Sequence, residues 1–413
     1  MVPVTANTAR EDAERVRLTP PGLLYSDTER DLAAALADLL TRKAAAADVI
    51  ARTERAETYD LALWRTVAAE IGLAGLLIPE ALGGAGATYR ELAAAAEQFG
   101  AFTASIPYLG SAAAATAALL SAARSSAAAP AGTAAPAGPV SPAAGLLSQL
   151  ADGSLTAALA VTVTTRPGAP FPGVVRVAGR DSAAGTVKLR GQIPAVADAL
   201  PAGVLLVPAD GVPNALYLVE ATGPGVHRTP LVSLDMTRQL CDVTLDDAPA
   251  RQVAVGAAAE AALLAGLRAA AVVIAAEQLG LAQRCLDLTV GYVKERHQFG
   301  RPIGSFQAIK HRLADLWTAI TLARAASRYA AACLATDDPD TPVAVALAKS
   351  ACCEAAVTAA EECVQLHGGI GFTWEHPAHL YLKRAKAASA AYGTPGAHRA
   401  ALASLVNLPP PSG

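Results

Sequence analysis

Two series of apolar residues recur every three to four positions in the first third of the chain, as on the buried face of a helix. They are Leu32, Leu36, Leu39 and Leu40, and then Leu61, Trp64, Val67 and Ile71. A loop punctuated by Pro and Gly follows at residues 77–86. The pattern predicts an all-α domain over residues 27–154, preceded by an N-terminal tail over residues 1–26.

Residues 121–145 interrupt this helical pattern. They consist almost entirely of Ala, Pro, Gly and Ser and show no apolar periodicity. Such a composition buries too little apolar surface to offset the entropy lost on ordering. We therefore expect a disordered surface insertion over residues 121–145, with helix resuming at residues 146–150.

The pattern changes over residues 155–250, where short runs rich in Val and Leu alternate with clusters of Gly and Pro. Residues 174–177 and 204–207 are two such runs, and their composition is typical of β-strands. From residue 256 to residue 406 long stretches of helical spacing return. The chain is therefore predicted to be an α+β multidomain protein. It has an N-terminal helical domain, a middle β-barrel or sandwich domain and a C-terminal four-helix bundle.

Overall composition excludes several classes of partner. The formal net charge is -3 and 17% of the residues are charged, which gives no electrostatic footprint for nucleic acid or an anionic membrane. The longest apolar run, residues 269–276, is too short to span a bilayer. The N-terminus lacks the basic and then apolar layout of a signal peptide.

Cysteine and histidine spacing gives no sign of a metal. The six cysteines contain no Cys-x-x-Cys pair, which argues against a disulfide framework or a zinc site and favours a reducing, cytoplasmic location. His367, His376 and His379 lack a fourth ligand at a suitable spacing, so no metal site is predicted. Asp235 and Arg238 are expected to form a buried structural pair.

Two glycine-containing segments in the last third of the chain are the strongest candidates for chemistry. The first begins at Arg296 and reads Arg-His-Gln-Phe-Gly-Arg-Pro-Ile-Gly-Ser-Phe-Gln, and the second begins at Gln365 and reads Gln-Leu-His-Gly-Gly-Ile-Gly-Phe. Arginine presents a planar charged fork that matches a pyrophosphate, and glutamine can donate to and accept from an adenosine. Paired glycines let backbone N–H groups approach a phosphate with no Cβ in the way.

These segments resemble the Arg-x-x-Phe-Gly and Gln-x-x-Gly-Gly motifs of the acyl-CoA dehydrogenase family. The order of the domains and the loop at residues 77–86 are similar to that family as well. The resemblance implies FAD as the cofactor, with both motifs of one subunit contacting the FAD of its neighbour. The residues at the matching positions are Arg296, Phe299, Phe306, Gln307, Gln365, Gly368 and Gly369.

The segments at which the family binds its own flavin ring are poorly matched. A Thr-Glu-Pro…Gly-Ser-Asp segment is replaced by Thr-Thr-Arg-Pro-Gly-Ala-Pro-Phe-Pro at residues 164–172. A Trp-Ile-Thr/Ser segment is replaced by Gly-Gln-Ile-Pro-Ala-Val-Ala at residues 191–197. The aromatic residue and most hydroxyl donors are missing, and the prolines remove backbone N–H groups. We expect this flavin seat to be lost; the alternative is that other residues bind a flavin there.

The glutamate with which the family removes the α-proton of an acyl-CoA is missing too. The resemblance places Tyr392 at one family position for this glutamate and Ala269 at the other. Holding a phenol as phenolate at pH 7 costs about 4 kcal/mol, which disfavours Tyr392 as the base. Lys383, Arg384 and Lys386 could lower that cost but are expected to form a solvated face. No catalytic residue is therefore predicted in this chain.

The chain matches the family where it would serve a neighbour's FAD and departs from it where it would bind its own. This asymmetry resembles the non-catalytic subunit of actinobacterial heterotetrameric (α2β2) acyl-CoA dehydrogenases, some of which oxidise CoA thioesters of steroid side chains. The resemblance implies a homologous catalytic partner that supplies the base, binds most of the acyl-CoA and shares its FAD. Two alternatives stay open: a homotetramer with a relocated base such as Glu277, and a flavin-free scaffold subunit.

Overall fold

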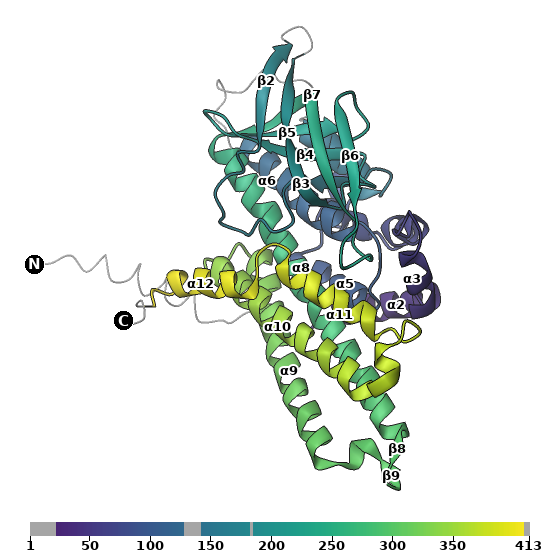
Figure 1. The fold of residues 1–413 in the computed structure, drawn as a ribbon. Coiled ribbons are helices and arrows are strands. Elements are labelled where there is room, and N and C mark those ends of the chain that lie inside the picture. The colour runs from purple at the N-terminus through teal and green to yellow at the C-terminus, as the bar shows by residue number, and fades with distance from the viewer. Residues whose placement is uncertain (1–21, 128–141, 182–184, 409–413) are drawn as a thin grey trace, which may run out of the picture.

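The computed structural model describes residues 22–127, 142–181 and 185–408. Its elements form an N-terminal helical part, a middle sheet and a C-terminal set of long helices (Figure 1). The N-terminal elements are α2 (Asp27–Lys43), α3 (Ala46–Thr53), α4 (Leu61–Arg65), η1 (Thr66–Glu70), η2 (Leu73–Gly75), η3 (Glu80–Leu82), α5 (Tyr89–Ala101), η4 (Tyr108–Ala115), α6 (Thr116–Ala127) and α7 (Pro142–Ala151).

The segment expected to be a disordered insertion is partly helical. Helix α6 continues through Ala127, and α7 already begins at Pro142. Alanine has the highest helix propensity, and α6 packs against α8, so the Ala-rich sequence at 121–127 extends a helix that is already anchored. The prediction was wrong for residues 121–127 and 142–145, and its remainder lies outside the described residues.

The middle part is a seven-stranded mixed sheet. Its strands are β1 (Ala157–Leu159), β2 (Val175–Asp181), β3 (Thr186–Ala197), β4 (Val204–Ala209), β5 (Ala215–Glu220), β6 (Val226–Leu231) and β7 (Leu240–Val255). The strand order is β1-β4-β5-β7-β3-β2, and β6 also pairs with β7. The register of β3 against β7 shifts between Ile193 and Val196, which places Pro194 at an irregularity where its missing N–H costs no ladder bond.

The C-terminal part contains the long helices α8 (Ala257–Glu295), α9 (Gln307–Ala335) and α10 (Thr341–His367). A short hairpin of β8 (His297–Gln298) and β9 (Arg301–Pro302) and a turn, η5 (Ile303–Ser305), connect α8 to α9. The chain continues through η6 (Gly368–Phe372), α11 (Ala378–Ala390) and α12 (Pro395–Leu405), and α8, α9, α11 and α12 all pack against α10. The predicted order of helical, β and helical domains is confirmed.

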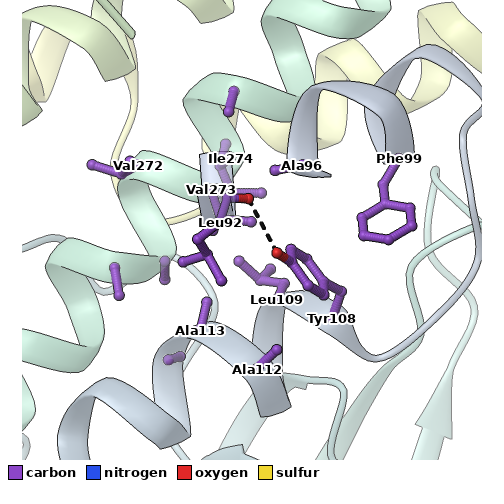
Figure 2. Packing of buried hydrophobic residues seen from close by; sticks show 14 of the residues in the cluster. Leu92, Ala96, Phe99, Tyr108, Leu109, Ala112, Ala113, Val272, Val273 and Ile274 are labelled. Atoms are coloured by element: carbon purple, nitrogen blue, oxygen red, sulfur yellow. Dashed lines mark hydrogen bonds between the residues drawn. The ribbon is translucent and has the colours of Figure 1, made fainter. Parts of the chain in front are cut away.

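Helices α5 and α8 and the segment η4 share a core of aliphatic and aromatic side chains (Figure 2). The hydroxyl of Tyr108 donates to the carbonyl of Leu92 at 3.1 Å, so the one polar group of that ring is satisfied inside the core. Where α5 crosses α8, a Cβ on Gly100 would lie 1.8 Å from the carbonyl oxygen of Glu277, and a Cβ on Gly280 would lie 1.8 Å from that of Glu97. The two helices therefore touch backbone to backbone, which only glycine permits at these positions.

Helices α8 and α10 are long and apolar enough to cross a membrane by length and composition alone. Within their most apolar windows, however, 61% and 67% of the residues are buried inside the fold. Buried core helices of this length have the same composition, so these two helices are weak evidence for a membrane span.

Candidate functional site

The first motif forms a hairpin at the end of the bundle that lies farthest from the sheet (Figure 1). Phe299 and Gly300 form its two-residue turn, with φ angles of 55° and 75°. Turns of this type need positive φ at both central residues, which is unusual for a phenylalanine. Its side chain is 92% exposed, so packing within this chain does not account for a phenylalanine at this position.

Arg296 directly follows α8, and its side chain forms no hydrogen bond or ion pair within the described part of the chain. Its backbone N–H donates to the carbonyl of Tyr292, and its carbonyl accepts from Ile303 at 2.7 Å, so the main chain is fixed on both sides. The exposed guanidinium forms no ion pair with any residue that the structure describes. An unpaired guanidinium on an ordered backbone is suited to an external anion.

The aromatic pair of the first motif is held in a defined arrangement. Phe306 lies 6.2 Å edge-to-face from Phe299, and the guanidinium of Arg301 lies 4.0 Å from its ring centroid. Gln307 begins α9, is exposed and lies within hydrogen-bond distance of His311 at 3.3 Å. The hairpin is therefore an ordered platform rather than a loose loop.

The second motif ends α10. Gly368 has a φ of 62° and its N–H donates to the carbonyl of Gln365, which closes the helix in a conformation that favours glycine. No atom lies within 4 Å of a Cβ built on Gly368 or Gly369, and both are exposed. The side chain of Gln365 is exposed beside them. This segment presents open backbone to whatever approaches it.

Two contacts bring the motifs together. The ring of Tyr292, one turn before Arg296, stacks on His367 with centroids 4.5 Å apart. The Arg312 side chain, near the start of α9, donates to Glu362 of α10 at 2.7 Å. The structure therefore places both sequence-predicted segments on neighbouring helix ends at the same end of the bundle.

A cavity of about 490 Å³ lies at the other candidate site, between the sheet and the loop that precedes α12. Both segments that replace the family's own flavin seat contribute to it, through residues such as Thr164, Pro170 and Ile193. Gly393 and Thr394 complete the wall beside the position predicted for a base. Its threonines retain some hydroxyl groups, but Pro170 and Pro172 offer no N–H group to a ligand there.

The two positions that match the family's catalytic glutamate are buried in this chain. Tyr392 is buried with a φ of 52°, and its N–H donates to the carbonyl of Val163 at 2.6 Å. Burial raises the pKa of Tyr392 above its ordinary value, and the negative charge of Asp198 raises it further. Ala269 is fully buried in α8 and carries no polar group. The structure gives neither position the means to take a proton at neutral pH.

Glu277 belongs to a buried ionic cluster that the sequence did not reveal. Its Oε2 accepts from Arg238 and also from Nη2 of Arg384, at 3.1 Å for the latter. Arg384 also donates to the hydroxyl of Thr237 at 2.8 Å and lies 3.7 Å from the carboxylate of Asp235. Because its Oε2 accepts from two buried arginines, Glu277 is a structural anion.

Two sequence expectations are corrected by this cluster. Asp235 and Arg238 are both buried, as expected, but each forms an ion pair with another residue: Asp235 with Arg384, and Arg238 with Glu277. Arg384 is 3% exposed and belongs to the cluster, so it does not lie on a solvated face. Lys386 fits that expectation, paired with Glu361 at the surface, and Lys383 is half-buried with its Nζ 4.3 Å from the ring centroid of Trp374.

A second buried carboxylate lies beside the cluster. Asp198 accepts from the hydroxyl of Tyr59 and, at 2.7 Å, from the backbone N–H of Gly110. Burial raises the pKa of Asp198, while the nearby charge of Arg238 lowers it. The cluster and this carboxylate draw on the loop at Tyr59, η4, the end of β3, α8 and α11, and the segment before β7. They fix the N-terminal helices, the sheet and the bundle to one another.

No group of three or more His, Cys, Asp or Glu side chains suited to a metal ion occurs in the described part of the chain. The rings of His367 and His376 lie with their centroids 4.3 Å apart and are tilted by 43°. The six cysteines are free and buried.

Known protein families match both helical parts. Residues 26–127 match the acyl-CoA dehydrogenase N-terminal domain, and residues 260–406 match the acyl-CoA dehydrogenase C-terminal domain. The chain belongs to the acyl-CoA dehydrogenase family. The resemblance inferred from the two glycine-containing segments is confirmed.

Three relatives match nearly the whole chain. The acyl-CoA dehydrogenase IpdE2 of Mycobacterium tuberculosis is 35% identical over 89% of this chain and 92% of its own length. The structure of the Tcur3481-Tcur3483 steroid ACAD is 30% identical with a TM-score of 0.77, over 92% of this chain and 98% of that one. The ChsE4-ChsE5 complex from Mycobacterium tuberculosis is 26% identical with a TM-score of 0.78, over 94% and 100%. Similarity to these members of the family thus extends through all three domains.

Proposed function

We propose that this chain is the non-catalytic subunit of a heterotetrameric (α2β2), FAD-dependent acyl-CoA dehydrogenase. The observation that carries the proposal is the exposed, unpaired Arg296 on an ordered hairpin, beside the open backbone of Gly368 and Gly369. The hairpin that follows Arg296 lies at the end of the bundle farthest from this chain's own sheet (Figure 1), and the stacking of Tyr292 on His367 links it to the helix end that carries the two glycines. A charged side chain that is unpaired within the described residues, beside exposed backbone, is suited to a cofactor held by a neighbouring subunit.

The residues at this end of the bundle fit an adenine dinucleotide. Arg296 would bind the pyrophosphate through its planar fork, and the backbone at Gly368 and Gly369, where no Cβ stands in the way, would let the same phosphates approach closely. Gln365 and Gln307 would donate to and accept from the adenosine, and the exposed ring of Phe299, with Phe306 behind it, would cover it. FAD, when bound, supplies the acceptor for the hydride that leaves the β-carbon of the acyl-CoA.

The partner supplies the base in this proposal. Tyr392 is buried with a raised pKa, and Ala269 has no proton acceptor. Glu277 is the relocated base of the homotetramer alternative, yet its carboxylate is held by two arginines and would leave them uncompensated if it took a proton. The geometry supports a catalytic glutamate in the other chain.

The relatives support the partner and the substrate class of this proposal. The partner would be a homologous acyl-CoA dehydrogenase chain that binds most of the acyl-CoA, and similarity to the ChsE4-ChsE5 complex and the Tcur3481-Tcur3483 steroid ACAD supports such a pairing. The substrate would be the CoA thioester of a steroid side chain, undergoing α,β-dehydrogenation. A cytoplasmic location is part of the proposal, in keeping with six buried, unpaired thiols.

Co-expression with a homologous catalytic chain encoded beside it tests the proposal. The flavin absorbance and the subunit ratio of the purified complex should give one FAD per pair of unlike chains. This chain purified alone should be colourless and prone to aggregation, because the exposed apolar side chains of its bundle, such as Trp317 and Leu322, lack their cover. A yellow homotetramer with one FAD per chain would establish the self-sufficient enzyme instead, and a complex without flavin would establish the scaffold.

A further inference from the structure

A separate cavity of about 400 Å³ lies between the loop at residues 166–168, α8, the start of α10 and α12. Its volume falls within the range of small-molecule sites. Two arginines, Arg166 and Arg268, line it, and no acidic side chain does. None of the residues predicted to contact a neighbour's FAD belongs to it.

Neither arginine has a carboxylate partner in the described part of the chain. Nη1 of Arg166 donates only to the carbonyl of the adjacent Pro167, at 3.2 Å. Arg268 rises from α8 and is half-buried. Burial lowers the pKa of Arg268, and no acidic group counters that effect. Two guanidiniums without counter-charge in one cavity create a positive potential that an anion would neutralise.

The remaining wall limits which anion fits. Nε2 of His398 donates to the carbonyl of Tyr392 at 2.8 Å, so this ring is fixed by its own chain. Most of the other lining is hydrocarbon, including Leu264, Val345 and Leu405. A bare inorganic anion would satisfy the arginines and leave these apolar surfaces in contact with water. A ligand with an apolar body would bury them.

We propose that this cavity binds an organic anion whose carboxylate lies between Arg166 and Arg268 and whose apolar body packs against Leu264, Val345 and Leu405. The guanidinium fork matches a carboxylate in bidentate geometry, and two forks can hold its two oxygens. The site shares Arg166 with the cavity beside Thr164, and none of its other lining residues belongs to that cavity.

Calorimetric titration of decanoate into the assembly in which the chain purifies tests the site. Decanoate should bind the unmodified protein. Arg166→Gln and Arg268→Gln should each weaken its dissociation constant about tenfold or more, through loss of a charge-assisted contact. Arg268→Lys should weaken it less because the charge remains, and Arg42→Gln, on the exposed face of α2, should leave it unchanged. Inorganic phosphate should bind far more weakly than decanoate.

Thermal unfolding without ligand separates binding from folding, because neither arginine has an ion pair to lose and each glutamine variant should keep its Tm. Three results would each overturn the proposal. Decanoate could fail to bind the unmodified protein. It could bind the double variant Arg166→Gln/Arg268→Gln as tightly as the unmodified protein, which would place it elsewhere in the assembly. Phosphate could match its affinity, which would remove the role of the apolar wall.

Discussion

Replacing Arg296 with alanine tests the proposed contact with a neighbour's FAD most directly. The side chain is exposed and forms no ion pair within the described residues, so its removal breaks no contact of this chain. The backbone bonds to Tyr292 and Ile303 survive the change. The cost to folding should therefore stay within about 0.5 kcal/mol, as for other exposed substitutions.

Cofactor binding should respond much more strongly. A hydrogen bond between a guanidinium and a phosphate contributes about 1.5 to 3 kcal/mol. At about 1.4 kcal/mol per factor of ten, Arg296→Ala should weaken the dissociation constant of FAD about 10- to 150-fold. Arg296→Lys keeps the charge and loses the planar fork, so its dissociation constant for FAD should lie between those of the unmodified protein and Arg296→Ala.

The assay is a fluorescence titration of FAD into the flavin-depleted heteromeric complex, with Tm and subunit ratio measured in parallel. Arg42→Ala is the matched control, because it removes an exposed arginine from α2. An unchanged FAD dissociation constant in Arg296→Ala would refute the assignment of this residue to the cofactor. A complex that separates into its chains would show instead that Arg296 holds the interface.

Three further outcomes are expected. Gly280→Ala places a Cβ 1.8 Å from the carbonyl oxygen of Glu97 and should destabilise the fold by about 1 to 3 kcal/mol or more in chemical denaturation. Gly291→Ala in the same helix is the control: its added Cβ would have no atom within 4 Å, so the change should be neutral or stabilising by up to about 1 kcal/mol. Tyr392→Phe should leave the turnover of the complex nearly unchanged, and a strong loss with FAD still bound would assign the active site to this chain. Burial lowers the pKa of His398 in the folded state. The fold is therefore destabilised as pH falls below about 6.5, where the unfolded state begins to take up a proton that the folded state does not. The fall in Tm between pH 7.5 and 5.5 should be smaller in His398→Gln than in the unmodified protein, and an equal fall would assign the acid sensitivity to other groups.

The sequence was sufficient to predict the order of the domains and the two segments at the end of the bundle. Helical spacing extends over many turns in α8, α9 and α10, so the periodic signal there is strong. Arg296 and Gly368 stand out because a charged fork after a long helix and a glycine pair at a helix end have few structural explanations. Their proximity could not be read from spacing, since it depends on how α8 packs against α10.

The buried ionic cluster could not be predicted in the same way. Glu277 lies 39 positions from Arg238 and 107 from Arg384, and each of these residues in isolation is typical of a helix surface or a turn. Only the packing of the bundle against the sheet brings the three together. Low-complexity sequence misled in the opposite direction at residues 121–127, because a composition typical of disorder also has high helix propensity when a folded helix precedes it.

The charged residues beside the sheet are paired with one another, whereas Arg296 in the first motif is not paired within the described part of the chain. Near the sheet, the carboxylates of Glu277 and Asp235 balance the two arginines that they contact, so removing any one of these groups would leave a buried charge uncompensated. At the far end of the bundle, Arg296 is ordered by its backbone and has no counter-charge in the described chain. A catalytic carboxylate has to be free to change its protonation state, and a cofactor-binding arginine needs an anion from outside. The distribution of satisfied and unsatisfied charge therefore favours a chain that completes another subunit's site over one that operates its own.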